Sequence, residues 1–167
     1  MKVDGAPWRT CANSAVPSLQ DSFSTATKSM SASAFFDTNV LVYAVVVQDD
    51  SRSQQAEDLI AEGGTVSVQV LNELAAVARR KAKMPWEEVR FAIENVKVLC
   101  PDPLPITLDT HREALAIAER YGYKIYDALM VASALEARCA ILYSEDMQNG
   151  QVIDQRLTIR NPFLPAR

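Results

Sequence analysis

The sequence predicts an α/β domain with three layers, α/β/α, in which helices cover both faces of a central parallel sheet. Short apolar runs of strand length alternate with segments whose apolar residues recur every three or four positions, as on one face of a helix. Strands that alternate with helices in this way are typical of parallel sheets. The 167 residues, 49% hydrophobic and 23% charged, are enough for one domain with an ample core.

The strands are expected where short apolar or β-branched runs lie between turn residues. The first run, Ala34–Phe36, ends abruptly at Asp37, and an apolar run spaced to begin a helix follows at once. The remaining strands are expected at residues 65–68, 104–108, 140–143 and 157–159.

The helices are expected between these strands, from their apolar stripes and end signals. Gly63 and Gly64 end the helix that follows Asp50, and a capping box at Thr110 begins the helix that stops at Gly122. The helix at residues 127–137 is apolar nearly all round and is therefore expected to be buried. Two more helices are expected, at residues 70–81 and 85–96.

Residues 1–33 differ from the rest of the chain. They are rich in Ser, Ala and Thr, show no helical or strand periodicity, and hold no apolar core of the kind that a secretory signal needs. We expect a disordered N-terminal extension, with Met30 as an alternative start because the organised sequence begins just after it. The folded domain is therefore assigned to residues 34–163.

The bulk composition excludes several classes of protein. The formal charge of -4 and the pI of about 5.0 exclude a generally cationic nucleic-acid binder, so nucleic acid would need a local basic patch or a metal ion. Three widely spaced cysteines and one histidine give a disulfide framework, a zinc cluster or a Ser-His-Asp triad little to build from. No apolar stretch approaches the roughly 20 residues that span a bilayer. We expect a cytoplasmic protein without a membrane partner.

Four carboxylates occupy positions where solvated charges are unusual. Asp37 ends the first strand, and Asp146 follows the strand at residues 140–143. The carboxyl ends of parallel strands lie at one edge of a sheet, so these two side chains can meet in one crevice. Glu73 lies on an apolar helix face directly after the second strand, and Asp127 begins the most apolar helix.

Such a cluster of carboxylates repels itself. Two of them at ~4 Å repel by roughly 4 kcal/mol at an effective dielectric constant of 20. A bound divalent cation offsets that repulsion, and ligands that are all oxygen atoms select Mg²⁺, or Mn²⁺, over zinc. Such an ion lowers the pKa of a bound water and stabilises the leaving oxygen of a phosphate ester. No general-base histidine is required, and we expect His111 to be a surface residue.

Each carboxylate also has a structural explanation when it is taken alone. Asp127 could cap a helix, Asp146 could be a turn residue, and Glu73 could favour the positive end of its helix. Asp37 is the hardest to explain in this way, because a buried aspartate is rare without a partner. The metal-site interpretation accounts for all four residues at once.

Four short motifs, in the expected order, resemble those of a known family: Phe36-Asp37-Thr38-Asn39, Asn72-Glu73, Tyr126-Asp127-Ala128-Leu129 and Ser144-Glu145-Asp146-Met147-Gln148. They resemble the motifs of PIN domains, and in particular of VapC-like toxin ribonucleases from type II toxin–antitoxin pairs. The resemblance runs from about Phe35 to Pro162. The long segment before the first aspartate departs from the family pattern.

The resemblance implies a metal-dependent endoribonuclease that hydrolyses RNA phosphodiester bonds with Mg²⁺ or Mn²⁺. It assigns the four carboxylates as catalytic metal ligands, and it assigns Thr38 and Asn39 as supports of Asp37 through hydroxyl and amide hydrogen bonds. Glu145 is either a peripheral acid or a solvated loop charge. The resemblance also implies a homodimer and a cognate antitoxin that covers the site.

One basic run offers a contact for RNA. Arg79, Arg80 and Lys81, with Lys83, lie at the end of the helix that carries Glu73. Cations are also favoured at helix C-termini by the helix dipole, so a structural role is the alternative. Six residues span about 9 Å of helix, so Arg79 would reach only phosphates that flank the cut.

Two other functions compete with the nuclease. The first is a catalytically inactive PIN-like module that only binds RNA or a protein, against which the retention of all four acids argues. The second is a phosphatase or receiver-like enzyme. Asp37-Thr38-Asn39 lacks the second aspartate that an Asp-x-Asp phosphatase needs, and the chain has no glycine-rich phosphate loop.

Overall fold

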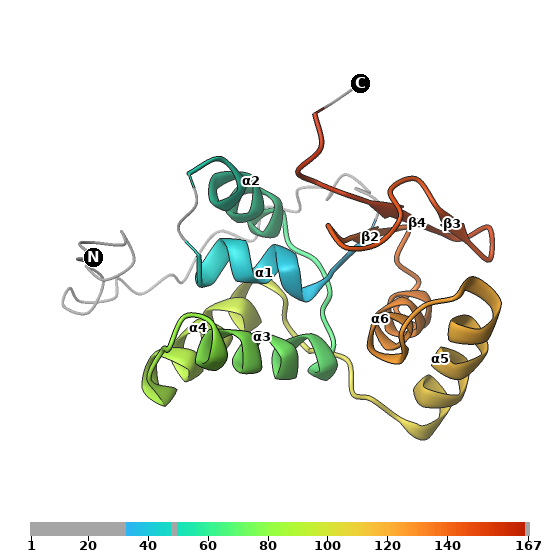
Figure 1. The fold of residues 1–167 in the computed structure, drawn as a ribbon, viewed down its shortest axis with the longest axis horizontal. Coiled ribbons are helices and arrows are strands. Elements are labelled where there is room, and N and C mark those ends of the chain that lie inside the picture. The colour runs from blue at the N-terminus through green and yellow to red at the C-terminus, as the bar shows by residue number, and fades with distance from the viewer. Residues whose placement is uncertain (1–32, 48–49, 166–167) are drawn as a thin grey trace, which may run out of the picture.

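The computed structural model describes residues 33–47 and 50–165 (Figure 1). The expected disordered extension, and the alternative start at Met30, therefore lie outside the described residues except for Ser33. The described part of the chain forms, in order, β1 (Ala34–Phe36), α1 (Thr38–Val45), α2 (Asp50–Ala61), α3 (Val68–Arg80), α4 (Trp86–Leu99), α5 (Leu108–Tyr121), α6 (Ile125–Glu136), β2 (Ile141–Tyr143), β3 (Val152–Ile153) and β4 (Leu157–Arg160).

The strands form one sheet in the order β1-β2-β4-β3. β1 pairs in parallel with β2, and β2 pairs in parallel with β4, with Phe35 opposite Leu142 and Leu142 opposite Ile159. The short β3 runs antiparallel to β4 at one edge, so the sheet is mixed. On the other side of β1, single parallel bridges join Phe35 to Thr65 and Ser67 to Leu104, which extend the sheet by two short segments.

The order of the strands determines which face each helix covers. The chain runs outward from β1 to Thr65 and then to Leu104, and it returns through α5 and α6 to β2 on the other side of β1. Because crossovers between parallel strands are right-handed, the outward helices α1–α4 and the returning helices α5 and α6 lie on opposite faces. Figure 1 shows these two groups of helices apart. The predicted α/β fold is confirmed.

The core fills the space between the sheet and both groups of helices. Phe35, Leu142 and Ile159, at the centre of the sheet, are completely buried. In α6, every residue from Ala128 to Leu135 is buried, as its continuous apolar sequence predicts. β1 and β2 are thus embedded in the core, and the residues considered below follow their carboxyl ends.

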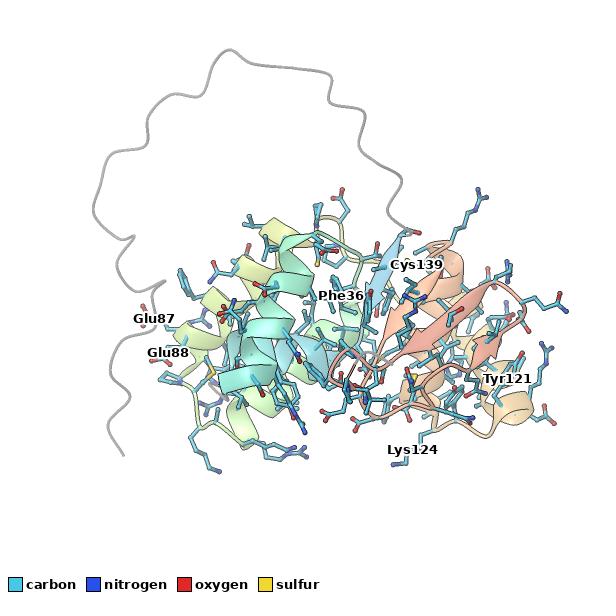
Figure 2. The ribbon with its side chains drawn as sticks, turned by 90° about the horizontal axis from the view of Figure 1, so that it is seen from above. Phe36, Glu87, Glu88, Tyr121, Lys124 and Cys139 are labelled. Atoms are coloured by element: carbon cyan, nitrogen blue, oxygen red, sulfur yellow. The ribbon has the colours of Figure 1, made fainter. Side chains whose placement is uncertain are left out.

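Gly64 allows the segment at Thr65 to approach β1 closely. A Cβ atom at Gly64 would lie 2.3 Å from Cε2 of the Phe36 ring and 3.1 Å from the carbonyl oxygen of Ala34. Phe36, the last residue of β1, is completely buried and is labelled in Figure 2. Glycine is thus the one residue that this pairing accommodates without a shift of its neighbours.

Several elements differ in extent from the sequence prediction. The expected strands at 65–68 and 104–108 shrink to the bridges at Thr65, Ser67 and Leu104, because α3 and α5 begin so soon afterwards. α5 begins at Leu108, and its cap is Thr107, whose side chain pairs reciprocally with Thr110.

β3 was not expected, because a strand of two residues has too little pattern to detect. Among the described residues, no helix combines the length and the apolar character that crossing a bilayer requires.

Candidate functional site

The predicted carboxylates gather where β1 and β2 end. Asp37 follows β1, and its backbone N–H donates to the carbonyl of Tyr143 at the end of β2. The loop that follows β2 begins at Ser144 and carries Asp146. Helices leave β1 and enter β2 on opposite faces of the sheet, so this edge is a topological switch point, where open α/β sheets place their ligands.

Asp37 is only 6% exposed and is held by three hydrogen bonds. Its Oδ1 accepts from the backbone N–H of Thr38 at 2.5 Å, so Asp37 is also the N-cap of α1. Its Oδ2 accepts from the Ser144 hydroxyl at 2.6 Å and from Asn39 Nδ2 at 2.9 Å. The amide contact from Asn39 is the one that the resemblance implied; Thr38 reaches Asp37 through its backbone instead.

The sequence interpretation quoted Ser144 within a motif but gave it no role. Its completely buried hydroxyl donates to Asp37 and accepts from the backbone N–H groups of Asp146 at 3.2 Å and Met147 at 3.3 Å. One side chain therefore fixes both the buried acid and the turn that carries Asp146. The available signal was its place directly after a buried strand, since serine hydroxyls often hold turns through backbone N–H groups two or three residues on.

Glu73 lies on α3, with its carboxylate next to the start of α1. Its Oε2 accepts from the Thr38 hydroxyl at 3.2 Å, and its Oε1 accepts from Gln69 Nε2 at 2.8 Å, one helical turn earlier. Thr38 thus links two acids, because its backbone contacts Asp37 and its hydroxyl contacts Glu73.

The other two predicted carboxylates, Asp127 and Asp146, come from α6 and from the loop after β2. Asp127 lies in the first turn of α6, whose N-cap is Lys124, so the capping explanation for Asp127 does not apply. Asp146 is exposed, and its Oδ2 accepts from Asn39 Nδ2 at 3.4 Å. Asn39 therefore reaches both Asp37 and Asp146 with the same amide group.

Glu73 and Asp146 interact electrostatically with both Asp37 and Asp127. Burial, together with the charges of Glu73 and Asp146, raises the pKa of Asp37 to about 7, although the hydrogen bonds from Ser144 and Thr38 act in the opposite direction. Partial burial raises the pKa of Asp127 as well; Lys124 lowers it, and Glu73 and Asp146 raise it. Glu73 and Asp146 therefore lie close enough to Asp37 and Asp127 to raise the pKa of both carboxyl groups.

The chemistry of the donor set fits a hard divalent cation, since it consists of carboxylate oxygens. Its mutual repulsion is the kind that bound positive charge relieves. Within the described residues, however, no three His, Cys, Asp or Glu side chains are arranged so that together they could hold a metal ion. The acids thus lie near one another, but their side chains do not form a ready-made coordination shell.

The predicted basic run lies apart from the acids. The Arg79 guanidinium donates to the carbonyl of Met84 and lies 5.0 Å from the centroid of the Trp86 ring, so it serves the end of its own helix. Arg80 and Lys81 are exposed. Lys124, which the sequence interpretation did not single out, has its charge near Asp127, and Figure 2 shows it extending from the surface.

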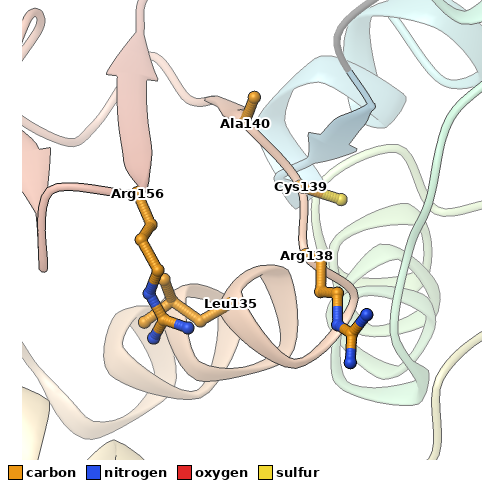
Figure 3. A pocket seen from close by; sticks show the side chains of 5 residues that line it. All are labelled: Leu135, Arg138, Cys139, Ala140 and Arg156. Atoms are coloured by element: carbon orange, nitrogen blue, oxygen red, sulfur yellow. The ribbon is translucent and has the colours of Figure 1, made fainter.

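A separate hollow lies at the other end of the strands, away from the carboxylates. Arg138, Cys139, Ala140 and Arg156 line it, and Figure 3 shows the two arginines on either side of the opening. Ala140 precedes β2 and Arg156 precedes β4, so the hollow lies at the amino ends of these strands. It is therefore separate from the carboxylates.

A family model described as PIN domain matches residues 34–149. The fold is similar to that of a toxin–antitoxin complex from Klebsiella pneumoniae, with a TM-score of 0.60 and 18% identity over 78% of this chain and 98% of that chain. It is also similar to Mycobacterium tuberculosis VapC20, a sarcin–ricin loop cleaving toxin, with a TM-score of 0.57 and 21% identity over 68% and 90% of the two chains.

A third similar structure is VapBC2 from Rickettsia felis bound to a DNA fragment from their promoter, with a TM-score of 0.56 and 20% identity over 77% of this chain and 97% of that chain. No curated protein sequence matches the chain. At these identities the structural likeness concerns the fold, and the family model covers most of the domain. The chain belongs to the PIN-domain family.

Proposed function

We propose that the protein is a Mg²⁺- or Mn²⁺-dependent endoribonuclease, acting as the toxin of a toxin–antitoxin pair. The observation that carries the proposal is Asp37, a buried carboxyl group held by three hydrogen bonds, whose pKa is raised to about 7 beside further acids. A carboxyl group whose pKa is strongly raised by burial and by neighbouring charges is typical of functional sites. VapC20, which has this fold, is described as a cleaving toxin.

In this proposal, the carboxylates of Asp37, Glu73, Asp127 and Asp146 hold the metal. Thr38, Asn39 and Ser144 orient Asp37 through the contacts described above. A bound ion would supply a more acidic water and a counter-charge for the phosphate. Lys124 and the more distant Arg79, Arg80 and Lys81 are the cations offered to the RNA backbone, whose phosphates dominate non-specific affinity.

The test is cleavage of RNA by the purified chain. Cleavage should require Mg²⁺ or Mn²⁺, stop with EDTA, and be lost in Asp37→Asn and Asp127→Asn variants that keep the wild-type circular dichroism spectrum. Glu119→Gln, which neutralises an exposed acid on α5, is the matched control and should cleave normally. Activity that survives the two aspartate substitutions would reject the assignment.

We also propose a protein partner that covers an apolar groove of about 540 Å³ between α1, α2 and α4. Val45, Ile60 and Phe91 are among its lining residues, and Glu57 and Glu88 add negative charge, so a partner segment with apolar and basic side chains would be complementary. The similar structure from Klebsiella pneumoniae is a toxin–antitoxin complex. Val98→Glu, at a highly exposed lining position, should prevent inhibition by the partner while RNA cleavage continues. The homodimer stays a prediction, which light scattering on the purified chain would test.

One observation favours a second candidate, the catalytically inactive PIN-like module that binds RNA or protein. No three acids of the described chain are placed to hold an ion together. Titration calorimetry with Mn²⁺ separates the two candidates, because the nuclease must bind the ion and the inactive module need not. Absence of Mn²⁺ binding by the wild-type chain would favour the module.

A further inference from the structure

A cluster of four side chains lies beside the acidic site and is not used by the proposed function. Arg52 of α2 donates to Glu145 Oε1 at 2.5 Å and to the Tyr43 hydroxyl at 2.6 Å. Its guanidinium carbon lies 5.3 Å from the centroid of the Tyr43 ring and 5.8 Å from that of Phe163. The two rings pack edge to face, with centroids 4.9 Å apart. We call these residues the Arg52 clamp.

Within the Arg52 clamp, Arg52 binds the side chain of Glu145, and two asparagine side chains bind the backbone of Glu145. The N–H of Glu145 donates to Asn39 Oδ1 at 3.3 Å, and its carbonyl accepts from Asn161 Nδ2 at 3.4 Å. Glu145 is thus tied to Arg52 rather than left as a solvated loop charge. The next residue is Asp146, whose carboxylate accepts from Asn39.

The clamp contributes more to local geometry than to global stability. The side chains of Arg52 and Glu145 are 43% and 25% exposed, and ion pairs of this exposure are worth little free energy of folding. They nevertheless join α1, α2, the loop after β2 and the C-terminal segment, which lie far apart in the sequence. An arginine packed against two rings has restricted freedom, so the contact fixes Glu145 in one place.

We propose that Arg52 is a positioning residue, which holds Glu145 and thereby keeps Asp146 turned toward Asp37 for metal binding. This inference rests on the proposed function. Arg52 acts through Glu145 and does not touch the metal or the RNA. It also pairs the charge of Glu145, which leaves Asp146 as the acid that this loop presents to the site.

Charge and positioning make opposite predictions for the removal of Arg52. A cation beside an acidic site weakens the binding of another cation, so on charge alone its loss should tighten Mn²⁺ binding. If Arg52 positions the loop, its loss should weaken Mn²⁺ binding, because residues that orient metal ligands typically contribute about tenfold or more to affinity.

The experiment is titration calorimetry of the full chain with Mn²⁺, for wild type, Arg52→Met, Arg52→Lys and Arg112→Met. Arg52→Met should bind about tenfold more weakly. Arg52→Lys, which keeps a cation within reach of Glu145, should recover part of the loss. Arg112→Met removes an exposed arginine paired with Asp109 on α5 and should bind like wild type.

Arg52→Met that binds Mn²⁺ as tightly as wild type, or more tightly, would overturn the inference and leave the proposed function standing. A wild-type chain that does not bind Mn²⁺ would overturn both. Circular dichroism checks the fold of each variant. Arg52→Gln, which keeps a donor for Tyr43, replaces the methionine variant if that variant does not fold, with the same expectation.

Discussion

Asp37 is buried when the chain folds, and its protonation is therefore linked to folding. Its pKa is about 7 in the folded chain against an ordinary value of 3.8, chiefly because of burial. At a pH between these two pKa values, Asp37 keeps its proton in the native state and loses it in the unfolded chain. The contribution of Asp37 to stability is thus fully present below about pH 4 and is lost as the pH rises through 7.

We predict that, in EDTA, the wild-type chain loses stability relative to Asp37→Asn as the pH rises from 4 to 8. The relative loss should approach about 4 kcal/mol, because each pKa unit corresponds to roughly 1.4 kcal/mol. Urea unfolding of both proteins at several pH values measures it. A difference in stability that stays constant with pH would show that Asp37 does not titrate in this range.

Two buried serines provide a matched pair for the hydroxyl contacts of the site. The Ser144 hydroxyl makes four hydrogen bonds, whereas the equally buried hydroxyl of Ser133 in α6 has no hydrogen-bond partner among the described residues. We predict that Ser144→Ala lowers the free energy of unfolding by about 1–3 kcal/mol and that Ser133→Ala is neutral or stabilising. Chemical denaturation at pH 8 measures both. Equal effects of the two substitutions would contradict the prediction.

The same contacts explain which site residues the sequence could reveal. Asp37 and Asp146 follow strands, and Glu73 and Asp127 lie in early helical turns, so the predicted elements place all four near strand ends or helix starts, and the family resemblance supplies their proposed role. The contact of Ser144 with Asp37 spans 107 positions and that of Arg52 with Glu145 spans 93. No local pattern encodes such partners, because they depend on how the finished elements pack.

At the scale of elements, the sequence predicted well wherever an apolar pattern was long. α6 is buried from Ala128 to Leu135, as its composition required. The strand predicted at 104–108 is too long. The N-cap of α5 is Thr107 and not Thr110, so only Leu104 is left to pair. Short segments are decided by neighbouring helix ends rather than by their own β propensity.

A substitution at Gly64 tests how closely the segment at Thr65 packs against β1. With no positive φ at Gly64, alanine would ordinarily stabilise the protein by about 0.4–1 kcal/mol through the unfolded chain. A Cβ atom 2.3 Å from the buried Phe36 ring should instead make Gly64→Ala destabilising by about 1–3 kcal/mol. Urea unfolding gives the sign. A stabilised variant would show that the Phe36 ring moves aside readily.

At the scale of the whole molecule, the order of the strands creates the site. Alternating strand and helix patterns predicted the α/β fold, and right-handed crossovers place α1–α4 and α5–α6 on opposite faces. The sequence could not reveal the antiparallel β3 or the groove between α1, α2 and α4, because both arise from packing between elements. The four acids come from both helical layers and both central strands, so an ion bound by them would tie the layers together.

We therefore predict that Mn²⁺ raises the stability of the entire fold. An ion that binds only the native state stabilises it by about 2.7 kcal/mol at 100 times its dissociation constant. Thermal unfolding in MnCl₂ against EDTA measures this gain, which should vanish in Asp37→Asn and persist in Glu119→Gln. The gain should be larger at pH 8 than at pH 5.5, since below pH 7 a proton competes for Asp37. A gain that survives in Asp37→Asn would place the ion elsewhere and separate the acid cluster from metal binding.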